Sequence, residues 1–389
     1  MNIIKDSIYH PGLFSNKEYK MCSKTVMDTT DVNITFDDKG ICNHYHNYQR
    51  TAQNFLLQEP ERSNKLEALI KKIKADGRNK KYDCLIGLSG GVDSTYVALL
   101  VKQYGLRPLA VHLDNGWNSE LAVHNVNSIV NTLDFDLHTL VVNWEEFKDI
   151  QLAYLKASVI DIEVVSDHAI QATMWKLAKE RNIGYIISGT NIVTEHILPA
   201  SWIYSKMDYA NLKDIHQKYG SKKIKTYPTL NFKKYVYYTG FHKLVPISIL
   251  DYVDYNKDAV KAAITKELNW RDYGGKHHES VFTKFYQAFI LPQKFGIDKR
   301  KAHLSTLICS GQISREDALK ELQTPLYNDN ELADDMQYIL KKFGLSEAEF
   351  DSIMRNPPRP HQSFKSDRDL KANYMKLLKK TERLRRIIR

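Results

Sequence analysis

The sequence predicts an α/β protein in which helices flank a parallel sheet, and three observations lead to this expectation. Short apolar segments alternate with segments of helical length between residues 82 and 191. Small polar residues follow three of the apolar segments. The 389 residues are 43% hydrophobic and 26% charged, the balance of a soluble globular protein. Strands and helices in this alternation form parallel sheets with right-handed crossovers.

The elements of this α/β core follow one another in order. A basic amphipathic helix comes first, over residues 61–79, with leucines and isoleucines at helical spacing. The four predicted strands are 82–88, 107–117, 136–142 and 183–191, and the helices between and around them are 94–105, 119–133, 145–158 and 167–182. Because ligands of such sheets bind at the carboxyl ends of the strands, we expect a site there.

Less regular segments surround the core. Residues 1–60 are predicted to be irregular because turn signals interrupt them, and residues 202–255 are rich in Tyr and Lys. Residues 296–323 are predicted to be helical, and a proline-containing linker precedes a last helix that begins at Asp367. We expect a small N-terminal knuckle at 1–60, an α/β domain at 61–255 and a mostly helical C-terminal region at 256–389.

Charge and composition exclude several classes of protein. Of the net charge of +10, the tail from Lys365 to Arg389 carries +7, so the other 364 residues are only slightly basic and indicate no nucleic-acid partner. No stretch approaches the ~18 consecutive apolar residues of a membrane span. We therefore expect no membrane partner. Four scattered cysteines are too few for a disulfide framework, which favours the reducing cytoplasm as the location of the protein.

The segment SGGVDST at residues 89–95 carries the strongest functional signal. It lies between a predicted strand and a predicted helix. Its two glycines let the backbone approach an anion, and the helix N-terminus offers free N–H groups. Asp93 would be out of place in a bare anion site, but it suits a Mg²⁺ ion that accompanies phosphates. The alternative is a plain tight turn into a capped helix.

Two further strand ends are candidates for the same site. Asp114 and Asn115 end the second strand, where they either face a ligand or form a type I′ turn with Gly116. The small residues SGTN at 188–191 follow the fourth strand. Three strand ends would then converge on one crevice.

The sequence resembles a known superfamily and, within it, one family. SGGVDS resembles the PP-loop of the N-type ATP pyrophosphatases, and segments 22–48 and 273–319 resemble the N-acetyl sugar amidotransferases of the WbpG and PseA type. The resemblance implies a Rossmann-like fold of the HUP type that binds ATP and Mg²⁺, the ion being held by Asp93. The ATP-binding residues that it implies are Ser89, Gly90, Gly91, Val92, Asp93, Ser94, Thr95, Asp114, Gly189 and Thr190.

The resemblance also implies a reaction. The acetamido oxygen of an N-acetylated, nucleotide-linked sugar acid would be adenylated by ATP. Ammonia would then displace AMP and leave an acetamidino sugar for O-antigen or flagellar glycan. The chain has no cysteine in the setting of a glutaminase nucleophile, because residue 2 is Asn2, Cys84 lies on a predicted buried strand and Cys309 lies in an apolar run. We therefore expect a separate glutaminase subunit and a cyclase-like subunit that channels ammonia, and the family suggests a homodimer.

The segment 273–303 supplies candidates for the sugar half of the reaction. Its Lys, Arg and His side chains would pair with an anionic substrate, and Glu279 would act as a base, although scattered lysines equally form solvated helix faces. The catalytic candidates are Asp93, Lys276, His277 and Glu279, and the substrate-binding candidates are Lys276, His277, His278, Lys284, Lys299 and Arg300.

The opening segment departs from the family. Its relatives carry two Cys-x-x-Cys pairs with zinc-ribbon spacing, whereas here the pairs are Cys22 with Thr25 and Cys42 with Tyr45. Two cysteines cannot close a tetrahedral site, although a nearby histidine could substitute. We therefore expect a zinc-ribbon-like knuckle with a vestigial site and no zinc.

Two other functions stay open. A tRNA-thiolating PP-loop enzyme would share the loop and the basic charge, but sulfur transfer needs reactive cysteines after the loop, and only Cys309 lies well downstream. A nucleotide-binding scaffold that activates a glutaminase would keep the loop without turnover.

Overall fold

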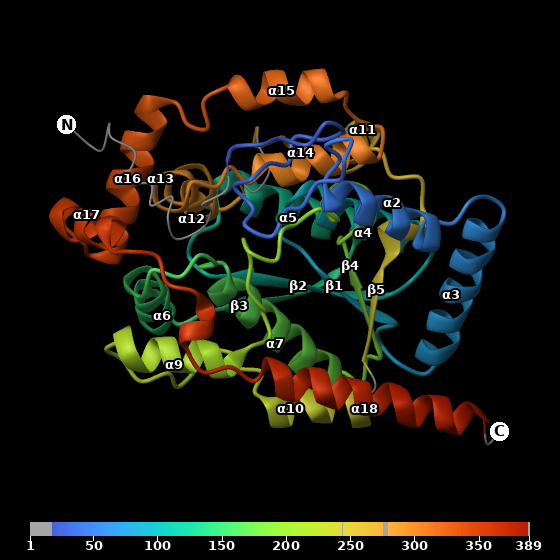
Figure 1. Ribbon diagram of the computed structural model, residues 1–389. Coiled ribbons are helices and arrows are strands. Elements are labelled where there is room, and N and C mark those ends of the chain that lie inside the picture. The colour runs from blue at the N-terminus through green and yellow to red at the C-terminus, as the bar shows by residue number, and fades with distance from the viewer. Residues whose placement is uncertain (1–17, 243, 275–278, 388–389) are drawn as a thin grey trace.

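The centre of the structure is a five-stranded parallel sheet, seen in a computed structural model that describes residues 18–242, 244–274 and 279–387 (Figure 1). The strands lie in the order β3-β2-β1-β4-β5, and every neighbouring pair is parallel. They are β1 (Cys84–Gly87), β2 (Pro108–Asp114), β3 (Asp136–Val141), β4 (Tyr185–Ser188) and β5 (Val245–Ser248). The strand order reverses between β1 and β4, which is the switch point where ligands bind in such sheets. The predicted α/β fold is confirmed.

Burial on both faces explains why the central strands are continuously apolar. Cys84 and Ile86 of β1 point into one core, whereas Leu85 points into another, and all three are fully buried. The first core contains α3 (Glu61–Gly77), α4 (Val92–Gln103), α5 (Glu120–Leu133) and α11 (Lys257–Leu268), and the second contains α7 (Val164–Glu180). The sheet is therefore covered on both sides.

The strand β5 is absent from the prediction. It has four residues and includes Pro246, which breaks the pattern of an apolar run. Proline is tolerated here because β5 is the last strand of the sheet, where one row of N–H groups needs no partner strand.

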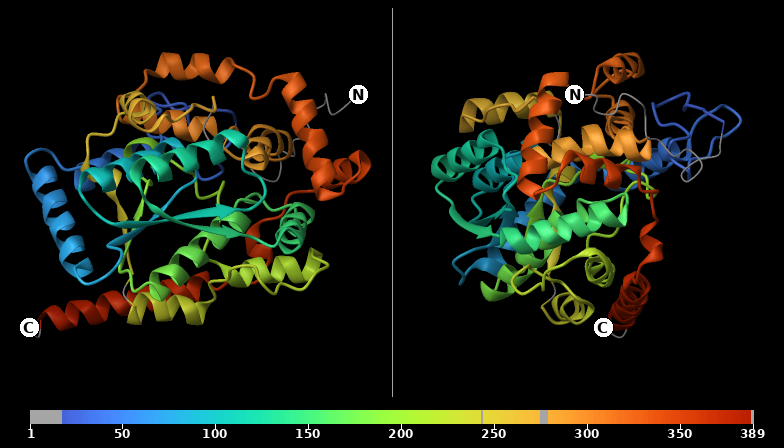
Figure 2. Two further views of the ribbon diagram at one scale, coloured as in Figure 1. Left: turned by 180° about the vertical axis from the view of Figure 1, so that it is seen from behind. Right: turned by 90° about the vertical axis from the view of Figure 1, so that its left-hand side faces the viewer.

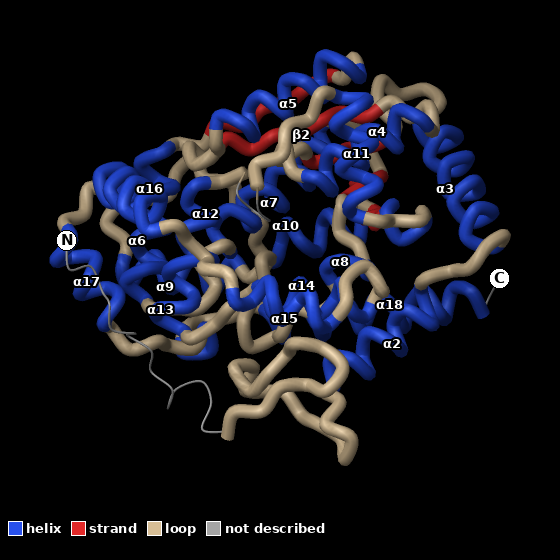
Figure 3. The backbone as a smooth tube through the Cα atoms, turned by 90° about the horizontal axis from the view of Figure 1, so that it is seen from above, coloured by secondary structure: helices blue, strands red, loops and turns tan. Residues whose placement is uncertain are grey.

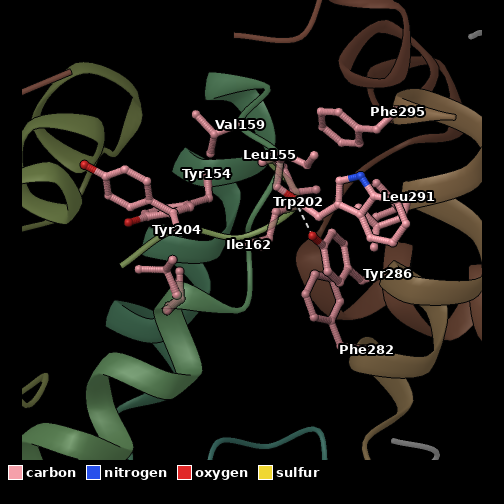
Figure 4. Close-up of a cluster of buried hydrophobic side chains, with 14 of the residues drawn as sticks. Tyr154, Leu155, Val159, Ile162, Trp202, Tyr204, Phe282, Tyr286, Leu291 and Phe295 are labelled. Carbon is pink, nitrogen blue, oxygen red and sulfur yellow. Dashed lines mark hydrogen bonds between the residues drawn. The ribbon is translucent and has the colours of Figure 1, made fainter. Parts of the chain in front are cut away.

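A further core lies beyond the sheet and joins distant parts of the chain (Figure 4). There Tyr154, Trp202, Tyr286 and Phe295 pack together, and the Tyr286 hydroxyl donates a hydrogen bond to the carbonyl of Ile160. The helices that contribute include α6 (Trp144–Ala157), α9 (Tyr209–Tyr219), α12 (Val281–Phe285), α13 (Leu291–Phe295), α16 (Asp329–Phe343) and α17 (Glu347–Arg355). The division into three domains stays a prediction, but this core contains side chains from all three.

The N-terminal knuckle from residue 18 to Cys42 consists of turns and isolated bridges at one edge of the molecule (Figure 3). Val26 packs on α14 (Arg300–Cys309) and α15 (Arg315–Gln323), and its N–H donates to Ser305 Oγ at 3.2 Å. The prediction of irregular structure was wrong for 43–55, which form α2 (Asn43–Phe55). This helix is mostly polar and buries only Tyr48, while Tyr45 and Ala52 pack partly buried against the same core.

The remaining elements are short, apart from the last. They are α8 (Ile192–Glu195), α10 (Phe232–Val236), the π-helices η1 (Tyr237–Phe241) and η3 (Tyr286–Ile290), the 3₁₀-helices η2 (Ile249–Tyr252) and η4 (His361–Ser363), and α18 (Arg368–Ile387). The helix α18 lies beside α10, and its C-terminal end extends past it (Figures 1 and 2). Within the described ranges, no helix has the length and apolar character needed to cross a bilayer.

Candidate functional site

The SGGVDST loop lies at the carboxyl end of β1 and leads directly into α4, as predicted from the sequence. Gly91 is the N-cap of α4. Gly90 has a φ of +81°, and a Cβ at this position would lie 2.6 Å from the carbonyl oxygen of Ala122. Only glycine satisfies both constraints, so the turn brings the loop backbone close to α5.

Side-chain hydroxyls bond the amides of the loop. Ser89 Oγ accepts from the Gly91 N–H at 3.2 Å, Ser94 Oγ accepts from the Ser89 N–H at 3.3 Å, and the two hydroxyls lie 3.1 Å apart. Thr95 is fully buried and donates to the Gly91 carbonyl at 2.7 Å. Thr95 therefore supports the loop, whereas Ser89 and Ser94 lie where a bound phosphate would meet them.

Residues that sequence reasoning missed hold the loop from behind. Trp270 Nε1 donates to the Gly90 carbonyl at 2.9 Å, and Asn125 Nδ2 donates to the same oxygen at 3.3 Å. The buried Asn125 also exchanges two hydrogen bonds of 2.9 Å with the backbone of Arg271. No local motif marks these residues, because they meet the loop only through the packing of α5 and the segment after α11.

Two tyrosines also contact the loop through their hydroxyl groups. The Tyr273 hydroxyl accepts from the Val92 N–H at 3.3 Å, and the Tyr255 hydroxyl donates to Asp93 Oδ1. Burial, and then the negative charge of Asp93, raise the pKa of Tyr255. Burial, and then the charge of Glu279, raise the pKa of Tyr273. Both hydroxyls are therefore protonated at neutral pH.

The turn after β4 lies against Asp93. A Cβ at Gly189 would lie 2.9 Å from the Cβ of Asp93, so this approach requires glycine. Thr190 Oγ1 lies 2.8 Å from Ser188 Oγ and 2.9 Å from Ser248 Oγ at the end of β5. The structure thus brings Gly189, a predicted ATP-binding residue, against Asp93 of the SGGVDST loop, and Thr190 follows it in the same turn.

The turn after β2 is not type I′, because Gly116 has a positive φ but Asn115 does not. Asp114 Oδ1 accepts from the Gly116 N–H at 2.9 Å, and Asn115 Oδ1 accepts from the Trp117 N–H at 3.1 Å. Asn115 also donates to Ser166 Oγ at the start of α7, at 3.2 Å. The role of Asp114 in ATP binding stays a prediction.

Glu279 reaches the site through a short backbone bridge. Its carbonyl accepts from the Ser119 N–H at 2.9 Å, and the Val281 N–H donates to the Trp117 carbonyl at 3.0 Å. One Glu279 carboxylate oxygen would lie 3.6 Å from a Cβ at Gly91. The Glu279 carboxylate is therefore beside the SGGVDST loop. The other candidates of this stretch, Lys276, His277 and His278, lie outside the described residues.

The three remaining substrate-binding candidates have protein partners. Lys284 pairs with Asp335 at 3.0 Å and Glu331 at 3.2 Å, and Lys299 pairs with Glu163 at 2.7 Å. Arg300 pairs with Asp298 at 2.7 Å and also donates to the carbonyls of residues 321 and 324. Each of the three cations therefore has a structural role in the protein. Their role in substrate binding stays a prediction.

The site fits ATP phosphates and Mg²⁺. Three loop amides are bonded by hydroxyls that phosphate oxygens would replace, and Gly90 and Gly91 leave the cradle without side chains. Asp93 is the carboxylate suited to a magnesium ion held largely by phosphate and water oxygens. Across the part of the chain that the structure describes, no three His, Cys, Asp or Glu residues form a metal-binding group on their own.

Cys22 and Cys42 meet in the knuckle, where both are fully buried. The Cys42 N–H donates to Cys22 Sγ at 3.2 Å, and Thr25 Oγ1 lies 3.8 Å from Cys42 Sγ. A hydrogen bond between the two free thiol groups lowers the pKa of Cys22 and raises the pKa of Cys42. Thr25 thus lies beside Cys42, and the vestigial zinc site stays a prediction.

Residues 279–380 match a family model described as the C-terminal domain of the WbpG-like LPS biosynthesis proteins. The C-terminal region is thus similar to WbpG. The resemblance predicted from segment 273–319 is thereby confirmed, and we call residues 279–380 the WbpG-like domain. This domain begins at Glu279, where its backbone bridges to residues 117–119, between β2 and α5. No curated protein matches the sequence.

Two solved structures show a weak likeness. NMN synthetase from Francisella tularensis is 16% identical, and the match covers 52% of this chain and 76% of that one, with a TM-score of 0.30. An NH3-dependent NAD synthetase from Campylobacter jejuni, in complex with nitrate, is also 16% identical, with coverages of 55% and 89% and a TM-score of 0.30.

Proposed function

We propose that this protein is the synthetase subunit of an ATP-dependent amidotransferase of the PP-loop type. One observation carries the proposal: the phosphate cradle of the SGGVDST loop lies beside Glu279, the first residue of the WbpG-like domain. A nucleotide bound in the cradle would therefore react at the boundary between the α/β core and a domain related to sugar biosynthesis.

Different residues of the cradle have different roles in the proposed adenylation. The N–H groups of Gly91 and Val92, at the positive end of α4, hold the departing pyrophosphate. Asp93 would hold the magnesium ion, which offsets charge that grows on the phosphates. Glu279, whose carboxylate lies beside Gly91, would accept a proton from the incoming ammonia.

The substrate in this proposal is an N-acetylated, nucleotide-linked sugar acid. Its acetamido oxygen attacks the α-phosphate of ATP and pyrophosphate leaves. Ammonia then displaces AMP, and the product is an acetamidino sugar for surface polysaccharide. The ammonia comes from a glutaminase subunit through a cyclase-like subunit, and the enzyme acts in the cytoplasm as a homodimer. The match to a WbpG-like domain supports this substrate class.

The cysteines argue against the sulfur-transfer alternative. Cys22, Cys42 and Cys84 are fully buried, and burial raises the pKa of Cys309 to about 12. A thiol with so high a pKa is protonated at neutral pH and is a poor nucleophile.

A product assay tests the proposal. The protein is mixed with ATP, Mg²⁺, ammonium chloride and a panel of UDP-linked N-acetylated sugar acids, and mass spectrometry follows AMP and the sugar. The expected result is AMP release that needs both sugar and ammonia, with oxygen replaced by NH in one sugar. AMP release that is stimulated by tRNA instead would support RNA modification. ATP binding without turnover, with the glutaminase partner also present, would support the scaffold.

A further inference from the structure

Asp93 lies in the first turn of α4, and a residue far along the chain holds its side chain. The Tyr255 hydroxyl donates to Asp93 Oδ1 from the segment between η2 and α11, 162 residues away. Tyr255 is only 5% exposed. A hydrogen bond from a buried, fixed phenol restricts the rotation of the carboxylate about its last torsion.

The turn after β4 confines Asp93 from another direction. The absence of a side chain at Gly189 lets this turn approach the Cβ and the backbone carbonyl of Asp93, where a Cβ would come as near as 2.9 Å. The Tyr255 ring is itself held by packing, with its centroid 6.0 Å from that of Tyr96. Asp93 therefore has a defined orientation before any ligand arrives.

We propose that Tyr255 is a positioning residue that orients the Asp93 carboxylate for magnesium. This inference rests on the proposed function, in which Asp93 holds the ion that accompanies the ATP phosphates. Mg²⁺ demands near-ideal octahedral geometry, so a carboxylate already turned toward its place binds with less loss of freedom than a rotating one. The burial of Tyr255 keeps its hydroxyl protonated and able to donate.

Titration calorimetry with ATP, with and without Mg²⁺, tests the role of Tyr255 without any need for turnover. For Tyr255→Phe we expect about a tenfold loss of ATP affinity in the presence of Mg²⁺, the range of a hydrogen bond to a charged group. We expect ATP affinity without Mg²⁺ to stay within about twofold of the wild-type value, because the loop amides are untouched. Tyr96→Phe is the matched control, since it removes a hydroxyl from the neighbouring ring and leaves the bond to Asp93 in place.

Three outcomes would overturn the assignment. Equal affinities in Tyr255→Phe and Tyr96→Phe would show that the bond to Asp93 does not matter for the ion. An equal loss with and without Mg²⁺ would show that Tyr255 only supports the fold. If the wild-type protein binds ATP with no magnesium dependence, the ion-holding role of Asp93 in the proposed function fails together with that of Tyr255. The first two results leave the proposed function intact.

Discussion

At the scale of single residues, the site is built from groups that a motif shows and groups that only tertiary structure shows. The glycines of SGGVDST and the carboxylate of Asp93 were predictable, because tight turns and magnesium sites restrict residue type locally. Trp270, Asn125 and Tyr255 were not, because each is an ordinary buried residue until the fold brings it to the loop.

Asp93→Asn tests the central carboxylate. The amide has nearly the same shape but no charge, so we expect AMP release to fall by about two orders of magnitude or more, with little change in folding. The measurement is ammonia- and sugar-dependent AMP release, with thermal unfolding as the control for structure. Turnover near the wild-type rate would contradict the PP-loop assignment.

Gly90→Ala tests the close approach of the loop to α5. The positive φ and the 2.6 Å contact with Ala122 should together cost roughly 2–3 kcal/mol of unfolding free energy. Gly311→Ala is the matched control, because its φ is +75° but nothing lies within 4 Å of an added Cβ. We expect the control to lose about 1 kcal/mol in urea unfolding. Equal losses in the two variants would mean that the contact with α5 is easily relieved.

At the scale of elements, apolar periodicity predicted most strands and helices of the α/β core but missed the edge strand β5 and elements outside the core. The four predicted strands and the helices around them are present, with ends shifted by a few residues. Among the missed elements, α2 is covered by other parts of the chain and β5 pairs with β4, so both form through distant contacts. A short segment of sequence does not show which distant segment will cover it or pair with it.

The helix α7 contains a buried histidine that should make the fold sensitive to acid. His168 lies 2.8 Å from the Lys206 carbonyl through Nδ1, and its Nε2 accepts from the Leu230 N–H at 3.0 Å. Burial lowers its pKa to about 4. The unfolded chain therefore binds more protons than the folded one between pH 6.5 and 4, and stability is lost as pH falls through this window, by about 3 kcal/mol in all.

His168→Gln should remove this part of the pH dependence. The measurement is the free energy of unfolding in urea at pH 7 and at pH 4.5, and the difference between the two should be smaller than in the wild-type protein. His46→Gln, at an exposed site paired with Asp37, is the control and should change the difference little. An unchanged difference in His168→Gln would show that other groups cause the acid sensitivity.

At the scale of the whole molecule, the two ends of α18 differ in charge and in their packing on the rest of the protein. Lys371 near its start is buried, pairs with Asp367 at 2.9 Å and donates to the Met207 carbonyl. Tyr374 donates to the Val236 carbonyl of α10 at 3.3 Å. Much of the +7 charge of the tail lies beyond these contacts, from residue 379 onward.

Two truncations test this division of α18. A chain that ends after Lys380 should unfold within a few degrees of the full chain and bind ATP equally well, because the contacts of Lys371 and Tyr374 remain. A chain that ends after Ser366 loses those contacts and should unfold at a clearly lower temperature. Equal unfolding temperatures would mean that α18 contributes nothing to the fold.

The core that Figure 4 shows in part limits which segments of this protein can be exchanged with those of a relative. It joins side chains of the knuckle and of α6 to those of α12, α13 and α16 in the WbpG-like domain. A chimera spliced at residue 279, where the family model begins, would divide this core and replace the side chains that the C-terminal helices contribute. A graft that exchanges the WbpG-like domain therefore has to carry the knuckle and α6 along with the C-terminal helices.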